Sequence, residues 1–267
     1  MLTDNFSYFL VKWQITTQCN FRCSYCTQVE SDKRKVFSED TAISRAKKLK
    51  EILLKVKKPI KLVLAGGELS IIKSLIEILN ALYVDNLKSL EFYTNFSNTE
   101  PYYKELIKWC EDRKIELLFC ASFHEEFAEE AMFFKKYESL EKSLENSFIE
   151  CVVTSKNVDY MKELRKRHKD LKLRFDPNKN ESISSINFDF SEEELNRYRN
   201  QQQNMQGKTC YQHGLLIKSD GRLFANNCKL VQFGHIDLLY NTEEILKEHL
   251  VTCSKSRCPM CHIQRIE

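Results

Sequence analysis

The 267-residue sequence predicts an α/β protein: a partial (β/α)6 barrel followed by a small C-terminal domain made of a β-hairpin and a helix. Through the first two thirds of the chain, short apolar runs alternate with amphipathic stretches, a pattern typical of βα units around a parallel sheet. After Pro177 this alternation stops and polar residues and turn signals follow. A hydrophobic content of 42% is enough to fill the core of such a barrel.

Six apolar runs are predicted strands, at 12–16, 60–64, 89–94, 115–121, 148–154 and 171–175. Helical patterns lie between them, at 38–57, 69–82, 101–113, 127–144 and 159–167. Ser38 is a suitable N-cap for the first helix, and Pro101 suits the first turn of the third. Six units are too few to close an eight-stranded barrel, so we expect an open one with its chemistry at the carboxyl ends of the strands.

The polar segment 178–185 is a predicted linker, which divides the chain into a barrel at 1–185 and a second domain at 186–267. Ser191 and the three glutamates after it resemble a capping box that opens a short helix. Apolar runs at 215–217 and 222–224 flank a turn that contains Gly221, which predicts a β-hairpin. A last helical pattern covers 242–250.

The charge balance and the apolar segments exclude several classes of protein. The net charge is +3, from 41 basic and 38 acidic residues, so no broad nucleic-acid-binding surface is expected. No signal peptide and no run of 18 apolar residues is visible, so we expect a cytoplasmic protein without a membrane span. In a reducing compartment, the 11 cysteines favour metal binding or catalysis over disulfides.

Three cysteines follow the first predicted strand directly, with the spacing Cys19-x3-Cys23-x2-Cys26. Three thiolates on one short loop can hold three corners of a four-iron cluster and leave the fourth iron open to a ligand. A zinc site or a set of buried thiols would also fit the spacing alone.

Two motifs resemble the radical S-adenosylmethionine (radical SAM) family. Residues 16–26 read TTQCNFRCSYC, which is similar to the cysteine signature of that family, and Gly66-Gly67-Glu68 follows the second strand as the family's Gly-Gly-Glu motif does. The resemblance implies that the three cysteines bind a [4Fe–4S] cluster whose open iron chelates SAM. It also implies that one electron cleaves SAM to a 5′-deoxyadenosyl radical, and that Gly66, Gly67 and Glu68 receive the SAM amino group.

Further candidates for cofactor binding lie at the ends of the later strands: Asn95, Ser122, His124, Thr154 and Arg174. Ser122 and His124 resemble a family position that contacts SAM, although His124 replaces the usual aspartate and could instead be a satisfied polar residue. Thr154 could face adenosine or cap its strand. Arg174 shares a face with Asp176, and the two could orient SAM or substrate or form a structural ion pair.

A second group of cysteines, Cys210, Cys228, Cys258 and Cys261, lies in the C-terminal segment. The predicted hairpin can bring the first two together, and the C-x2-C pair completes four ligands. The segment resembles the shortened ("twitch") form of the SPASM domain, which implies an auxiliary [4Fe–4S] cluster and therefore two clusters in all. Cys253 could replace one of the four ligands, and zinc could replace the cluster.

The sequence therefore predicts a radical SAM enzyme of the oxidoreductase type that abstracts hydrogen from a small organic substrate, such as a sugar, cyclitol or nucleotide derivative in natural product biosynthesis. Dehydrogenation and epimerisation are both possible outcomes. The short segment before the first strand favours this interpretation. The alternative is a maturase that crosslinks, epimerises or oxidises a ribosomal peptide, and a more distant one is a non-catalytic metal-binding protein. The family resemblance implies a flavodoxin or ferredoxin as electron donor.

Overall fold

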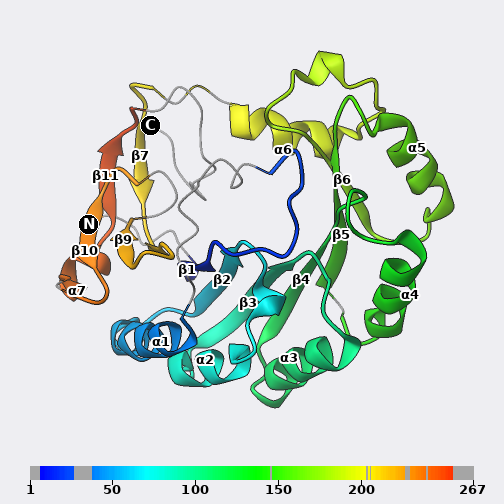
Figure 1. Ribbon diagram of the computed structural model, residues 1–267. Helices are drawn as coiled ribbons and strands as arrows, with labels where there is room; N and C mark the ends of the chain where they lie inside the picture. The colour runs from blue at the N-terminus through cyan, green and yellow to red at the C-terminus, as the bar shows by residue number, and fades with distance from the viewer. Residues whose placement is uncertain are drawn as a thin grey trace.

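The computed structural model describes residues 7–26, 38–144, 146–202, 204, 206–225, 229–238 and 240–254. A nine-stranded sheet forms its centre, with the strand order β10-β9-β8-β1-β2-β3-β4-β5-β6 (Figure 1). The six barrel strands pair in parallel and overlap the six predicted runs, which confirms the partial barrel: β1 (Phe9–Thr16), β2 (Ile60–Gly66), β3 (Leu87–Thr94), β4 (Glu116–Phe123), β5 (Asn146–Val153) and β6 (Leu173–Pro177).

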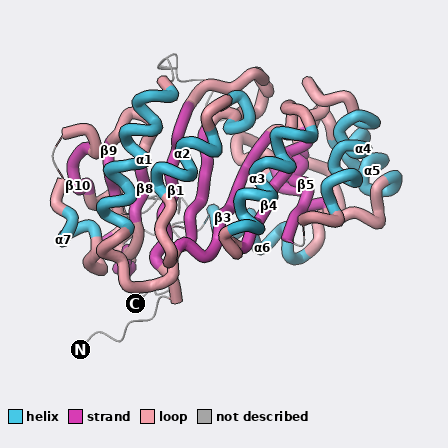
Figure 2. The backbone as a smooth tube through the Cα atoms, turned by 90° about the horizontal axis from the view of Figure 1, so that it is seen from below, coloured by secondary structure: helices cyan, strands magenta, loops and turns pink. Residues whose placement is uncertain are grey.

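Five helices cover the convex side of this sheet (Figures 1 and 2): α1 (Glu39–Leu53), α2 (Leu75–Leu82), α3 (Glu100–Asp112), α4 (Glu130–Glu141) and α5 (Val158–Arg167). The core lies between the two layers, where strand residues such as Trp13, Leu64 and Phe92 are at most 1% exposed. Because side chains alternate along a strand, Gln14 and Tyr93 lie on the opposite, concave face. The concave face therefore carries polar residues, whereas the convex face packs into the hydrophobic core.

The predicted helix over 69–82 is two elements, a 3-10 turn η1 (Leu69–Ile71) and α2. The hydroxyl of Tyr102 donates to the carbonyl oxygens of Leu69 and Ile72, at 3.1 and 3.2 Å. These two bonds tie the break between η1 and α2 to Tyr102 of α3. A second 3-10 turn, η2 (Ile183–Ser185), lies in the predicted linker.

The C-terminal part extends the barrel sheet. β8 (Leu215–Ile217) pairs in parallel with β1, and β9 (Arg222–Phe224) and β10 (Gln232–His235) follow in antiparallel fashion, which confirms the predicted hairpin. Arg45 of α1 fastens this extension, because its guanidinium donates to both carboxylate oxygens of Asp237 and to the carbonyl oxygen of Ser219. The predicted domain boundary thus falls within a chain whose two parts share one sheet.

Two further elements complete the C-terminal part. α6 (Glu192–Gln202) begins at the predicted capping box, in which the Ser191 hydroxyl accepts from the Glu194 N–H and the Glu194 carboxylate accepts from the Ser191 N–H. The predicted helix over 242–250 is wrong beyond its first turn. α7 (Thr242–Ile245) is short, and β11 (His249–Thr252) pairs with β7 (Thr209–Gln212), a partner about forty residues away that local periodicity does not show.

No helix in the described ranges is both long and apolar enough to cross a membrane.

Candidate active site

The cysteine loop, residues 19–26, begins three residues after the end of β1, at the carboxyl edge of the barrel. Cys23 is buried, whereas Cys19 and Cys26 are partly exposed. The Phe21 N–H donates to Cys19 Sγ at 3.3 Å, and the Cys26 N–H donates to the Cys23 carbonyl at 3.1 Å. Short-range bonds of this kind curl the loop so that its three thiols share one region of the barrel edge.

The glycine pair at the end of β2 supports the base of this loop. The Gly67 N–H donates to the Thr16 carbonyl at 2.9 Å, and the Glu68 N–H donates to the Gln18 carbonyl at 2.8 Å. A Cβ atom added at Gly66 would lie 2.3 Å from the Thr16 carbonyl oxygen, and one at Gly67 would lie 1.9 Å from that of Gln18. Only glycine permits this close approach. The two glycines are therefore needed for packing against the cysteine loop, in addition to any contact with SAM.

Glu68 is 1% exposed and is held by its own chain. Its carboxylate accepts hydrogen bonds from the Ser70 N–H at 2.7 Å, from the Thr94 hydroxyl at 2.5 Å and from the Asn95 N–H. Burial raises the pKa of Glu68, and these three donors oppose that shift. The carboxylate therefore ties the end of β2 to the end of β3.

Asn95 carries this support on to the cysteine loop. Its side-chain amide donates to Asn20 Oδ1 at 2.8 Å and lies 3.9 Å from Cys19 Sγ. Phe96, the next residue, has a φ of 58°, a left-handed conformation that is unfavourable for an aromatic residue. The ammonium group of Lys136 holds this turn, since it donates to the Phe96 carbonyl and, at 2.7 Å, to the Asn98 carbonyl.

The segment after β4 grips the other side of the loop. Glu126 accepts from the Ser24 N–H at 2.7 Å and also from the Ser24 hydroxyl. The Tyr25 hydroxyl shares a 2.9 Å hydrogen bond with His124 Nδ1 and lies 3.4 Å from a Glu125 carboxylate oxygen. Burial lowers the pKa of His124 to about 4, so this imidazole is neutral at physiological pH. His124 therefore contacts the loop aromatic residue directly.

The donor set of the loop fits an iron–sulfur cluster. No three Cys, His, Asp or Glu side chains among the described residues converge on a single-ion site. In a cubane each thiolate binds a different iron, so the three thiols need not converge on one point. Burial, together with the charge of Glu126 and the neighbouring thiols, raises the pKa of Cys23 to about 12. Cluster binding would thus have to displace the thiol protons.

Two of the predicted residues lie farther along the barrel. Thr154 is 6% exposed, and its hydroxyl oxygen accepts from the N–H groups of Lys156 and Asn157, at 3.2 and 3.1 Å. Thr154 thus caps the end of its strand, and a contact with adenosine stays a prediction. Ser122 lies on the concave face, in register with Glu150 of β5.

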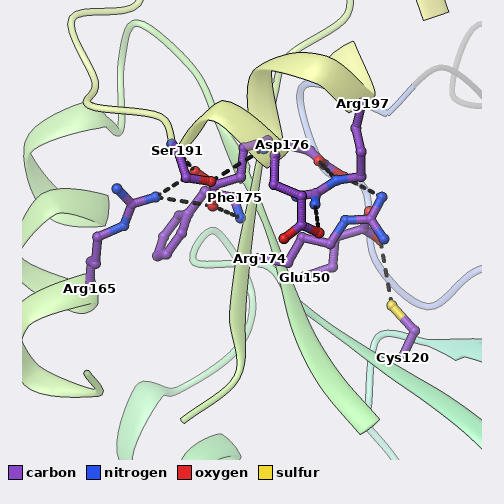
Figure 3. Close-up of polar contacts among 10 residues, drawn as sticks. Cys120, Glu150, Arg165, Arg174, Phe175, Asp176, Ser191 and Arg197 are labelled. Atoms are coloured by element: carbon purple, nitrogen blue, oxygen red, sulfur yellow. Dashed lines mark hydrogen bonds and ion pairs between the residues drawn. The ribbon is translucent and has the colours of Figure 1, made fainter. Parts of the chain in front are cut away.

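An ionic cluster occupies the concave face of β5 and β6 (Figure 3). Arg174 and Asp176 form the ion pair expected from their spacing, with Nη2 and Oδ2 3.4 Å apart. Arg197 of α6 joins the same carboxylate, with Nε 3.3 Å from Oδ1. Burial and the neighbouring Asp176 raise the pKa of Glu150, and the Cys120 thiol lies 3.6 Å from that carboxyl group. Polar groups thus replace the apolar layers that usually fill a barrel.

The second group of cysteines is only partly within the described residues. Cys210 lies in β7 and is 2% exposed, and Cys253, which follows β11, is 5% exposed. The Gly207 N–H donates to the Cys253 carbonyl, and the Cys253 N–H donates to the Lys208 carbonyl, so the β7–β11 pairing brings both cysteine segments together. Cys228, Cys258 and Cys261 lie outside the described residues, and their roles stay predictions.

No family model and no curated protein matches the sequence. Solved structures do match. The enzyme anSMEcpe with bound AdoMet (SAM) has a TM-score of 0.59 and 17% identity, over 89% of this chain and 82% of that one. BtrN in complex with AdoMet and 2-DOIA has a TM-score of 0.52 and 18% identity, over 87% of this chain and 80% of that one. Both are radical SAM enzymes. The chain has the radical SAM fold.

A third match with the radical SAM fold is anSMEcpe with AdoMet and the Cp18Cys peptide, with a TM-score of 0.57 and 18% identity over 88% of this chain and 78% of that one. At this level of identity the likeness concerns the fold, so the residues of this chain must carry the chemistry.

Sequence reasoning missed Glu126, Glu150 and Arg197. Glu150 had a detectable signal, because a carboxylate inside an apolar strand alternates with the core residues Ile149 and Cys151. Glu126 and Arg197 had none, because each acts on a residue from a distant element.

Proposed function

We propose that this protein is a radical SAM enzyme, which reductively cleaves SAM and abstracts a hydrogen atom from a polar organic substrate. The single observation that carries the proposal is the cysteine loop, which lies at the carboxyl end of β1 and rests on the Gly66-Gly67 backbone within a radical SAM fold. A [4Fe–4S] cluster with bound SAM would supply a one-electron cleavage and a 5′-deoxyadenosyl radical.

The residues of this chain would hold and orient that cofactor. Cys19, Cys23 and Cys26 would bind three corners of the cluster, and the main chain at Gly66 and Gly67 would face the amino group of SAM. The carboxylate of Glu68 already accepts three internal hydrogen bonds, which supports a role in fixing the glycine turn. Asn95 and His124 would keep the loop in place through their contacts with Asn20 and Tyr25.

The concave face supports a small polar substrate, such as a sugar, cyclitol or nucleotide derivative. Arg174, Asp176, Glu150 and Arg197 offer both donors and acceptors of hydrogen bonds. Polar groups in a barrel interior are stable only with partners, so a substrate rich in oxygen or nitrogen would suit them. A dehydrogenation or an epimerisation would be consistent with this site.

The second candidate function is peptide maturation. It is favoured by the match to anSMEcpe with its Cp18Cys peptide, which has the same fold over a similar share of the chain. BtrN, which matches comparably, is bound instead to 2-DOIA. The two candidates share hydrogen abstraction as a first step and differ in what occupies the concave face.

An auxiliary cluster is the second part of the proposal. Cys210, Cys228, Cys258 and Cys261 would hold it, with Cys253 as the alternative ligand. The support is the burial of Cys210 and Cys253 and the pairing of their strands. A flavodoxin or ferredoxin would deliver the electron for SAM cleavage.

Anaerobic reconstitution with iron and sulfide, followed by dithionite and SAM, tests both parts. We expect 5′-deoxyadenosine to form and about eight irons per chain to bind. Alanine at Cys19, Cys23 and Cys26 should abolish SAM cleavage, whereas alanine at Cys258 and Cys261 should preserve some cleavage. Cys110→Ala, at a buried thiol of α3, is the matched control. Absence of 5′-deoxyadenosine from iron-loaded wild type would refute the proposed function, and about four irons with bound zinc would refute the auxiliary cluster.

A further inference from the structure

Two guanidinium groups on the concave face share one ionised carboxylate. Arg174 and Arg197 both contact Asp176, at 3.4 and 3.3 Å. Burial opposes ionisation of Asp176, but the contact with Glu150 and the two guanidinium charges outweigh it, so the pKa of Asp176 is lowered. The pKa of Glu150 is raised by burial and by Asp176, which favours its neutral form. Inside the barrel, the two guanidinium groups therefore share the ionised Asp176 carboxylate, beside a Glu150 whose pKa is raised to about 7.

Both arginines also have an N–H without an acceptor. No described residue accepts from Arg174 Nε or from Arg197 Nη2, and both atoms are shielded from solvent. The remaining contact of Arg197 is from Nη1 to Glu193 at 2.8 Å, but the Glu193 side chain is 86% exposed and solvent screens its charge. Unpaired buried donors are costly, so these two N–H groups favour an acceptor that the described residues do not supply.

Arg174 lies below the strand ends that carry the cysteine loop. Arg174 pairs with Glu150, which lies three residues before Val153 at the end of β5. With about 3.3 Å per residue, the pair lies roughly 10 Å below the carboxyl edge of the sheet. The cysteine loop, the glycine turn and His124 all follow strand ends. Arg174 thus lies deeper in the barrel than the cysteine loop, the glycine turn and His124, at the level of Ser122.

Lys218 follows β8, the strand that pairs with β1 on the side of the barrel away from β6 (Figure 1). Burial, together with the charges of Lys229, Arg222 and Lys12, lowers the pKa of Lys218 to about 8, against a weaker opposing effect of Asp220.

We propose that Arg174 and Arg197 bind an oxyanion of the substrate, a carboxylate or a phosphate, within the barrel. Guanidinium groups suit this role because their planar N–H pairs match the oxygens of both anions. This inference rests on the proposed function, because it assumes that the barrel holds a substrate. It deepens that function by adding an anionic group to the polar substrate.

Anion binding is measured on the anaerobically reconstituted holoprotein by its thermal midpoint Tm, with inorganic phosphate or acetate as the probe. At ten times its Kd, a probe should raise Tm by roughly 3 °C for a chain of this size. The rise should disappear in Arg197→Gln and Arg174→Gln. It should shrink in Arg197→Lys, which keeps a charge beside Asp176 but lacks the planar donor pair.

Arg199→Gln is the matched control, because Arg199 lies on the same helix, pairs with Glu192 and has a side chain 57% exposed. It should keep the full rise. A response to phosphate indicates a phosphorylated substrate, and a response to acetate alone indicates a carboxylate. No rise with either probe in the wild type, or an equal rise in Arg197→Gln, would overturn the proposal.

A measurement with saturating SAM distinguishes a substrate site from a SAM site at the two arginines. We expect the rise in Tm to persist with SAM present, whereas its loss would assign the arginines to the cofactor and overturn the proposal. Formation of 5′-deoxyadenosine by the wild type is measured in parallel. Protein that binds the probe but never cleaves SAM would refute the proposed function alone, and protein that cleaves SAM without binding either probe would refute the anion site alone.

Discussion

Replacing Gly67 with alanine should displace the cysteine loop. The added Cβ would lie 1.9 Å from the carbonyl oxygen and 2.5 Å from the carbonyl carbon of Gln18, which are both backbone atoms. Since such contacts are not found below 3.0 Å, the Gln18 peptide would have to move by about 1 Å. Cys19 is the next residue, so the first cluster ligand would move with it.

A misplacement of about 1 Å near a reacting centre can lower a rate by roughly 100-fold. We therefore expect Gly67→Ala to reduce 5′-deoxyadenosine formation by about that factor under dithionite. The change that SAM causes in the electron paramagnetic resonance spectrum of the reduced cluster should weaken in parallel. This second readout reports cofactor binding separately from turnover.

Gly207→Ala is the control for Gly67→Ala. Gly207 has a φ of 79° but nothing within 4 Å of an added Cβ, so it tests backbone strain without a steric contact. It should lower Tm slightly and leave SAM cleavage near the wild-type rate. If Gly67→Ala binds its cluster and cleaves SAM at the wild-type rate, the close packing of the glycine turn against the loop does not position the cluster.

Three further substitutions test single carboxylates: Glu68 and Glu126 at the site, and Glu130 between α4 and α5. Glu68→Gln should destabilise the protein by about 2 kcal/mol, because an amide cannot accept from all three internal donors, and thermal unfolding measures the loss. Glu126→Ala should remove both acceptors of Ser24 and speed iron release to a chelator about fivefold. Glu130→Gln should remove the 2.7 Å ion pair with Arg167 and cost about 1 kcal/mol at pH 7, after allowance for solvent screening.

The Glu130 effect has a defined pH dependence. Burial opposes ionisation, but hydrogen bonds from Arg167, Tyr160 and His168 outweigh it and lower the pKa of Glu130 to about 2. A group whose pKa is lowered on folding stabilises the native state above its unfolded pKa. The difference in Tm between wild type and Glu130→Gln should therefore be full at pH 7 and shrink as the pH falls from about 4.5 towards 2.

Exposed glutamates supply the controls for these three variants. Glu77→Gln on α2, Glu138→Ala on α4 and Glu163→Gln on α5 should each change stability by less than about 0.5 kcal/mol. Iron release at the wild-type rate from Glu126→Ala would show that the Ser24 contact does not hold the loop. A Glu68→Gln protein as stable as Glu77→Gln would contradict the role assigned to the buried carboxylate.

The sequence by itself determined the barrel, the hairpin and the position of the first cysteine group. Each has a local sequence pattern. The barrel follows from apolar runs with the spacing of βα units, and the hairpin from a glycine turn between two short apolar runs. The cysteine group follows from ligands on one short loop directly after a strand. Local patterns fix backbone conformation because side chains alternate along a strand and favour buried or exposed faces.

Only the tertiary structure decided which distant residues meet. Ser24 and Glu126 are separated by 102 positions, and they meet because the ends of β1 and β4 lie on one edge of the same sheet. Arg197 reaches Asp176 because α6 packs against β6. The helix expected over 242–250 gave way to β11 for the same reason, since a strand exists only with its partner. Such contacts depend on strand order and register, which local periodicity leaves open.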